Sequence, residues 1–352
     1  MHRAPQLDLF STPASDLDQA PAAAAPAAFR SATPAAQNPP SLKVAPATPA
    51  PKYPRFPTRR SSGAAFGDAI ATAWYGYGAH DASRMDIPVG IVALLALYPM
   101  KTPGCSHAPI LADFLAASSP KDLVTAFREV AARAWMERPD LIDVAAPILR
   151  WTEEGHGGAT LRAIKAVVRA ALRHGVLQYT GDSDPEVRSQ IDLMSWAVTS
   201  LRHHNSRKGL GEYHTPPEVC DLMARMVMDF SEITPGRRIN VSDPAAGTGG
   251  LLRAAIQLAR ERGYSPHDFR WMLQEIDPVS AAGAAVNVLV WDAGPGALVA
   301  CGDTLAEGDL AERALEHQRA AFGLRDEMVA QARFLAALRH MDTLLDGELT
   351  AS

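Results

Sequence analysis

Cysteine is scarce in this sequence, and long apolar runs are absent. The three cysteines, Cys105, Cys220 and Cys301, are widely separated and form no Cys-x-x-Cys pair. They predict neither a disulfide framework nor a zinc site, so we expect no bound metal. The longest apolar stretch, residues 89–98, is shorter than the roughly 18 residues of a membrane-spanning helix, and no secretory signal pattern opens the sequence. We therefore expect a cytoplasmic protein without a membrane partner.

An excess of basic residues is also missing. With 34 Lys and Arg against 39 Asp and Glu, the formal net charge is −5. This balance argues against a nucleic-acid-binding coat over the whole chain but leaves room for a local basic face. Apolar residues make up 47% and charged residues 21% of the chain, as in a globular protein. The length of 352 residues accommodates one large domain or two ordinary ones.

Composition and periodicity divide the chain into four segments. Residues 1–62 are dominated by Ala, Pro, Ser and Thr, which predicts a disordered tail. Residues 63–208 carry apolar residues at helical spacing and predict a helical domain. Residues 209–306 show strand and helix patterns in the order βαβαβ, and residues 307–352 are helical again. The predicted fold class is α/β: a helical domain, then a partial Rossmann-like domain with its ligand at the carboxyl ends of the strands.

Two short basic segments each have two interpretations. Residues 52–60 interleave basic residues with Tyr53 and Phe56, and predict a solvated linker in preference to a contact with DNA phosphates. Residues 202–208 predict a phosphate-binding stripe or, equally, the basic carboxyl end of a helix.

A glycine-rich turn, VSDPAAGTGG, occupies residues 241–250 between a predicted strand and a predicted helix. Its glycines do not match the Gly-x-Gly-x-x-Gly pattern of dinucleotide-binding folds, and it lacks the lysine of a P-loop. A third interpretation uses the residues around the glycines, namely Asp243, Pro244 and the segment GEYHTPPEV at residues 211–219.

Four segments in order, GEYHTPPEVCDLM, VSDPAAGTGGLL, LQEIDP and CGDTL, resemble the successive S-adenosylmethionine-binding motifs of type I restriction-modification-like adenine-N6 DNA methyltransferases. The resemblance covers residues 205–306 and extends more weakly to the helical segment before them. It implies a bacterial protein that binds S-adenosylmethionine as cofactor and acts on DNA. The partners that it implies are DNA and a second methyltransferase or specificity subunit.

The resemblance assigns cofactor contacts to polar residues near the strand ends. Asp243 would pair with the cofactor's ammonium group and Thr248 would donate its hydroxyl, while Glu275 would accept from the ribose hydroxyls. Asp303 would accept from the adenine amino group. Taken singly, Asp243 is also readable as a turn residue or helix cap, and Glu275 and Asp303 as solvated strand ends. Asn287 is interpreted as a capping or packing amide. The other predicted contacts are Tyr213, Thr215, Pro216, Pro244, Gly247 and Gly249.

Residues that would hold a target base are missing. In the resembled family an Asn/Asp-Pro-Pro-aromatic loop after the fourth strand binds the flipped adenine, but no proline follows Leu305 here. Residues 38–41 read Asn-Pro-Pro-Ser, without the aromatic residue, and we interpret them as part of the tail. We therefore predict no catalytic residue and a chain that is incomplete for catalysis by itself. Three strands also leave the edge of the first to be covered by a partner chain, a second copy or the helical domain.

The sequence QLDLF near the start resembles the pentapeptide by which bacterial proteins bind the replication sliding clamp. Its residues are Gln6, Leu7, Asp8, Leu9 and Phe10. The two leucines and the phenylalanine supply apolar anchors, and the glutamine supplies a hydrogen-bonding amide, on a tail that can extend along a groove. An alternative function follows, that of a non-enzymatic S-adenosylmethionine-binding adaptor that docks on the sliding clamp.

Overall fold

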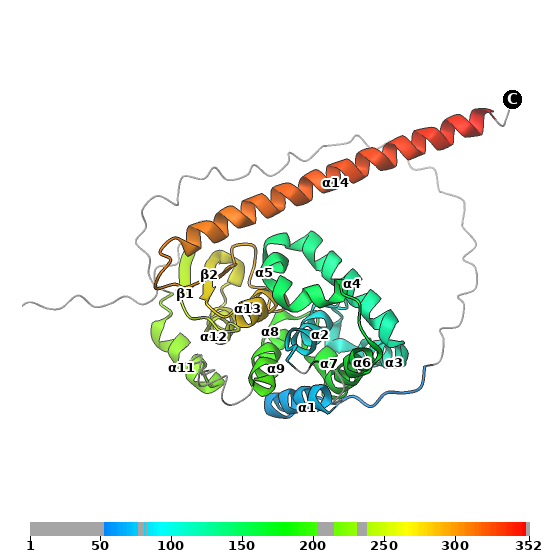
Figure 1. Cartoon of the computed structure of the whole chain (residues 1–352). Helices are drawn as coiled ribbons and strands as arrows, with labels where there is room; N and C mark the ends of the chain where they lie inside the picture. Colours follow the sequence, from blue (N-terminus) through cyan, green and yellow to red (C-terminus); the bar gives the residue numbers. More distant parts are fainter. Residues whose placement is uncertain (1–52, 77–80, 82, 203–214, 231–237, 350–352) are drawn as a thin grey trace, which may run out of the picture.

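The computed structural model describes residues 53–76, 81, 83–202, 215–230 and 238–349 (Figure 1). The predicted clamp-binding residues 6–10, the Asn-Pro-Pro-Ser segment at 38–41 and Tyr213 lie outside the described residues. Within the described ranges, no helix is both long enough and apolar enough to cross a lipid bilayer.

Residues 53–202 form a helical module. Its central helix α2 (Asp86–Leu97) is apolar all round and buried over most of its length, as a helix surrounded by other helices must be. By contrast α6 (Gly158–Arg173) is amphipathic, with Ile164 and Val168 buried and Arg162 and Arg169 exposed. The remaining helices of the module are α1 (Gly63–Tyr75), α3 (Ala108–Ala117), α4 (Pro120–Glu137), α5 (Pro139–Leu149), α7 (Val176–Thr180), α8 (Pro185–Arg188) and α9 (Leu193–Leu201).

The packed chain begins before the predicted boundary at residue 63. Residues 53–62, here called the strap, run against α6 and α7, where the Arg59 backbone N–H donates to the Arg173 carbonyl at 3.0 Å. Phe56 is only 6% exposed and belongs to the core of the module. The prediction of a disordered tail is therefore wrong for these residues, because an aromatic side chain within a polar segment finds a buried site that composition alone does not reveal.

Three parallel strands form one sheet in the order β1-β2-β3, which confirms the predicted α/β class with a small parallel sheet. Residues 239–243 of β1 pair with residues 269–273 of β2, and residues 272–275 of β2 pair with residues 298–301 of β3. The central strand is buried over most of its length, because helices cover both of its faces. The elements are β1 (Ile239–Asp243), α12 (Gly250–Glu261), β2 (Phe269–Glu275), α13 (Pro278–Val290) and β3 (Leu298–Cys301).

Helix α13 joins the sheet to the helical module, and Figure 1 shows it between them. Small residues dominate its sequence, SAAGAAVNV, and they are buried on every side. At Gly283 an added Cβ would lie 3.1 Å from Thr248 on the sheet side and 3.5 Å from Met194 of α9, so a larger residue would press on both neighbours. One continuous core therefore runs from Phe56 to Val299 across the predicted boundary at residue 208.

The last helix, α14 (Leu310–Leu349), begins against the outer strand. Leu310 and Ala314 pack with Met272 and Leu298, and Gln318 donates to Asp140 of α5 at 3.0 Å. Beyond this contact the helix extends away from the body of the molecule (Figure 1).

Candidate functional site

Three loops meet at the carboxyl ends of the strands. The Ala246 N–H, after β1, donates to the Gln274 carbonyl of β2 at 2.9 Å, and the Gly302 N–H, after β3, donates to the Glu275 carbonyl at 3.0 Å. These hydrogen bonds fix the glycine turn between the ends of β1 and β2, where a doubly wound sheet binds its ligand.

Asp243 closes β1 with a half-satisfied carboxylate. Its Oδ1 accepts the Ala245 N–H at 3.1 Å, which is the bond of a turn, but its Oδ2 is buried and has no hydrogen-bond partner among the residues that the structure describes. Burial raises the pKa of this carboxyl group; the Ala245 N–H opposes the shift, and the nearby Glu275 adds to it. A buried acceptor without a donor is costly, so this oxygen is suited to a cationic or hydrogen-bonding ligand.

Glu275 is 9% exposed and is not the solvated strand end of the alternative interpretation. Its Oε2 accepts the Gly247 N–H at 2.8 Å and its Oε1 accepts the Asp277 N–H at 2.8 Å. The carboxylate thus holds the glycine turn and the loop after β2 in one arrangement. Each oxygen keeps a second lone pair that a ligand hydroxyl can use.

The two glycines of the turn have left-handed backbones, with φ of +56° at Gly247 and +93° at Gly249. A Cβ at Gly247 would meet no atom of the described residues within 4 Å, so the described chain leaves the space beside this residue open. Gly249 is the N-cap of α12 and has no side chain to cap the first N–H groups of that helix, and no other described side chain is seen to accept from them.

Thr248 points the other way, into the protein. Its hydroxyl donates to Asp192 Oδ2 at 2.7 Å, and the Asn287 amide donates to Asp192 Oδ1 and to the Thr248 carbonyl, each at 2.8 Å. All three residues are nearly inaccessible to solvent. The predicted ligand contact of the Thr248 hydroxyl is thus replaced by an internal bond. Asn287, which the sequence left as a packing or capping amide, is a member of this buried network.

The remaining predicted residues differ in their surroundings. Asp303 Oδ1 accepts the backbone N–H groups of Leu305 and Ala306, the pattern of a turn residue. Thr215 and Pro216 are exposed and lead into α11 (Pro217–Val227). The Cys220 sulfur in the first turn of this helix lies 3.5 Å from a Cβ built on Gly250, so α11 begins beside the glycine turn.

One contact each shows where Pro244 and the start of the basic segment after α9 lie. The Pro244 carbonyl accepts the Thr304 hydroxyl at 2.9 Å, which ties the loop after β1 to the loop after β3. Arg202 begins the segment predicted as a phosphate-binding stripe or, equally, as the basic carboxyl end of a helix. It is the C-cap of α9, is buried and pairs with Asp277 at the N-cap of α13. It therefore belongs to the joint between module and sheet; residues 203–208 lie outside the described part of the chain.

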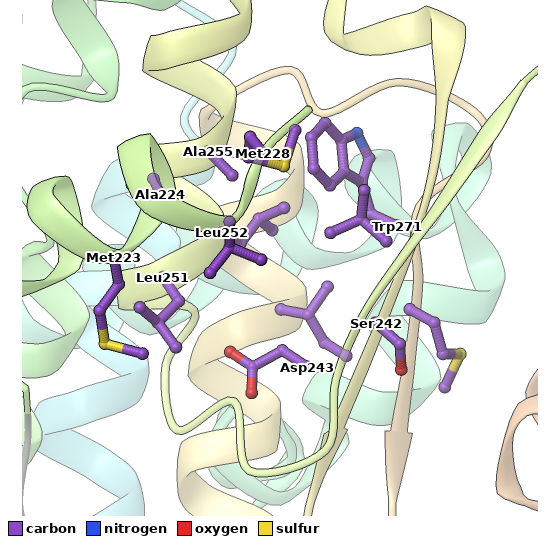
Figure 2. Close-up of a pocket in the computed structure, with 13 residues that line it drawn as sticks. Met223, Ala224, Met228, Ser242, Asp243, Leu251, Leu252, Ala255 and Trp271 are labelled. Carbon is purple, nitrogen blue, oxygen red and sulfur yellow. The ribbon is translucent and has the colours of Figure 1, made fainter. Parts of the chain in front are cut away.

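A cavity of about 50 Å³ lies against β1, between α11 and α12. Figure 2 shows the Asp243 carboxylate directed from the strand toward Leu251. Val241 and Ser242, whose side chains face opposite sides of the sheet, both line it, so the cavity reaches round the edge of β1. Of the predicted cofactor contacts it contains Asp243 alone. Within the described chain, that edge of β1 pairs with no other strand.

Residues 197–320, from α9 into the first part of α14, match the family model described as N-6 DNA Methylase. A search of the curated proteins finds no match.

Proposed function

Because residues 197–320 belong to the N-6 DNA methylase family, we propose that this chain binds S-adenosylmethionine at the carboxyl ends of β1 and β2 and serves DNA adenine methylation. The observation that carries the proposal is the buried Asp243 Oδ2, an acceptor without a donor beside open space at Gly247. The cofactor supplies an activated methyl group when bound.

Charge complementarity assigns the methionine end of the cofactor to Asp243 and the start of α12. Asp243 Oδ2 accepts from the ammonium group, a charge-assisted hydrogen bond that compensates the burial of the carboxylate. The first N–H groups of α12, without a side-chain cap, receive the carboxylate of the same ligand. Thr215 and Pro216 precede α11, whose first turn lies beside the glycine turn, and they are assigned as a cover for this end.

The nucleoside end is assigned to the two other loops. Glu275 accepts from the ribose hydroxyls with the lone pairs that Gly247 and Asp277 leave open. Asp303 accepts from the adenine amino group with the oxygen that its turn does not use. Thr248 acts by holding the turn in place, through Asp192, rather than by touching the ligand.

The base pocket is proposed to come from outside residues 1–352. The free edge of β1 is a template for a further strand, and the apolar cavity beside it offers a place for that strand's side chains. Leu222 and Met226 of α11, which are 58% and 76% exposed, extend this apolar surface. A strand followed by an Asn/Asp-Pro-Pro-aromatic loop, on a second methyltransferase or specificity subunit, would complete both the sheet and the site.

Calorimetry with S-adenosylmethionine and S-adenosylhomocysteine tests the proposal. We expect one site in the wild type and no binding in Asp243→Ala. The matched control is Asp268→Ala, because Asp268 is an exposed aspartate just before the amino end of β2 and should leave binding unchanged. Absence of binding by folded wild-type protein at roughly millimolar ligand would refute it.

A second activity is proposed from the sequence at residues 6–10, docking on a bacterial sliding clamp. A peptide of residues 1–15 should bind the clamp, and the full chain with Leu9→Ala and Phe10→Ala should lose that binding. The melting temperature should stay unchanged, because the core described here begins at Phe56. Equal clamp affinity for the wild type and the double variant would remove the proposal.

A further inference from the structure

Basic side chains gather on one face of the helical module, where the strap crosses α6. This surface has five exposed arginines and one half-buried lysine. We call this surface the basic face, and it consists of Arg59, Arg60, Arg162, Lys165, Arg169 and Arg173. Arg169 and Arg173 lie over the ring of the buried Phe56, at 4.8 and 5.7 Å from its centroid, which brings the strap and the helix together.

The charges of the basic face are not neutralised by described residues. Elsewhere on the surface arginines pair with carboxylates, as Arg84 does with Asp86 and Arg225 with Glu261. Across the described ranges, no ion pair within 4 Å involves any member of the basic face. The acidic residue that touches the strap, Asp113, accepts the Phe56 backbone N–H instead.

Hydrogen bonds to carbonyls hold several of these cations without cancelling their charge. Arg60 donates to the Gln178 carbonyl at 2.6 Å, Arg169 donates to the Ala116 carbonyl at 3.1 Å, and Lys165 donates to the Ser118 carbonyl. The cations affect their neighbours: burial, and then the charges of Arg59 and Arg173, lower the pKa of His174. The result is a preorganised surface of concentrated positive potential in a protein of net charge −5.

Structural roles account for only part of the cluster. Cations near the carboxyl ends of helices stabilise the last carbonyls, which explains Lys165 and Arg169 at the end of α3 and Arg173 in the last turn of α6. They do not explain Arg162, which makes no hydrogen bond to those carbonyls, or the two consecutive arginines of the strap. The cluster is also too long for one phosphate group, because residues 162 and 173 are separated by about 16 Å along a helix.

We propose that the basic face binds the phosphate backbone of duplex DNA without sequence preference. Duplex DNA presents one charge per roughly 1.7 Å along its axis, which suits a row of cations rather than a pocket. The choice of DNA among polyanions rests on the proposed function. In Figure 1, α6 and the strap lie at the end of the molecule away from the sheet, so this contact is separate from the cofactor site and anchors the chain on DNA.

Fluorescence anisotropy with a labelled 30-base-pair duplex of arbitrary sequence and the full chain tests the proposal. The variant is the triple Arg59→Gln, Arg162→Gln and Arg173→Gln, whose side chains make no hydrogen bond recorded in the described structure. The control replaces three arginines that pair with acidic residues and changes the net charge equally: Arg133→Gln and Arg313→Gln at exposed positions, and Arg325→Gln at a half-buried one.

We expect the basic-face variant to lose affinity by at least about tenfold at low salt, and its log–log salt slope to fall by about two to three. The control should bind as the wild type does, and lysine at the same three positions of the basic face should restore binding, which excludes misfolding. Equal losses in the variant and its control, or an unchanged salt slope, would overturn the proposal. Tighter wild-type binding to single-stranded RNA or to vesicles with about one-third anionic lipid would also overturn it.

Calorimetry with S-adenosylmethionine on the same proteins separates this proposal from the preceding one. A wild type that binds cofactor but not DNA refutes the basic face alone. A wild type that binds DNA but not cofactor refutes the cofactor site and leaves the basic face standing as a polyanion-binding surface.

Discussion

The Thr248 hydroxyl donates to the buried carboxylate of Asp192 at 2.7 Å and thereby fastens the glycine turn to the helical module. Asn287 of α13 reinforces the bond by donating to both residues. Asp192 is also the N-cap of α9, where it accepts the Ser195 N–H at 2.9 Å. The shape of the candidate cofactor turn is therefore set by a residue of the helical module.

Replacing Thr248 with valine should destabilise the protein by about 1–3 kcal/mol, because a buried carboxylate then loses the hydrogen bond from this hydroxyl while the shape is kept. The free energy of unfolding in urea measures this loss. Thr304→Val is the matched control, since that hydroxyl donates to the Pro244 carbonyl at an exposed position, and we expect a much smaller change. Equal losses at the two positions would show that the Asp192 contact contributes nothing.

Replacing Asp243 with asparagine should produce a pH-dependent difference in stability. Burial raises the pKa of Asp243, so the folded protein binds this proton more tightly than the unfolded chain does. Between the ordinary value of about 4 and the raised value, stability of the wild type falls as pH rises, and asparagine removes this contribution. Melting temperatures of the two proteins without ligand, measured from pH 4 to 7, should diverge in favour of the variant as pH rises. A constant difference would contradict the raised pKa that follows from the burial of this half-satisfied carboxylate.

A fragment of residues 209–352 should not fold by itself. Helix α13 is buried on all sides, and without α5, α2 and α9 it would expose one whole apolar face. Circular dichroism and amide NMR dispersion of the fragment, against the full chain, test this expectation. A cooperatively melting fragment would instead support the predicted domain boundary at residue 208.

The isolated chain should transfer no tritiated methyl group to unmethylated DNA, even with saturating cofactor. Binding the cofactor leaves the target amine unplaced, and placement supplies much of the rate of such a transfer. The variant Asn38→Ala should give the same result as the wild type in this assay. A partner chain that carries an Asn/Asp-Pro-Pro-aromatic loop should create activity. Adenine methylation by the isolated chain would refute the missing-pocket argument, and its loss in Asn38→Ala would identify residues 38–41 as the acceptor loop.

Local patterns in the sequence determined the elements around the candidate site. The segments that end in Asp243 and Glu275 are predicted as strands of the βαβαβ pattern, and the structure has β1 and β2 there, since strand formation depends on nearby residues. The glycines predicted a turn, and both adopt left-handed backbones there. The four ordered motifs also pointed to the family that residues 197–320 match.

Only the tertiary structure decided which partners the polar residues take. Thr248 is predicted to face a ligand and bonds Asp192 instead. For Arg202 the sequence leaves a phosphate-binding stripe and the basic end of a helix equally open, and the structure places it at the C-cap of α9, paired with Asp277. Phe56 is predicted in a disordered tail but is buried in the core, and its burial holds the strap and its arginines against α6. These contacts join residues that are far apart in the chain, and periodicity carries no information about which distant groups become neighbours once a core excludes water.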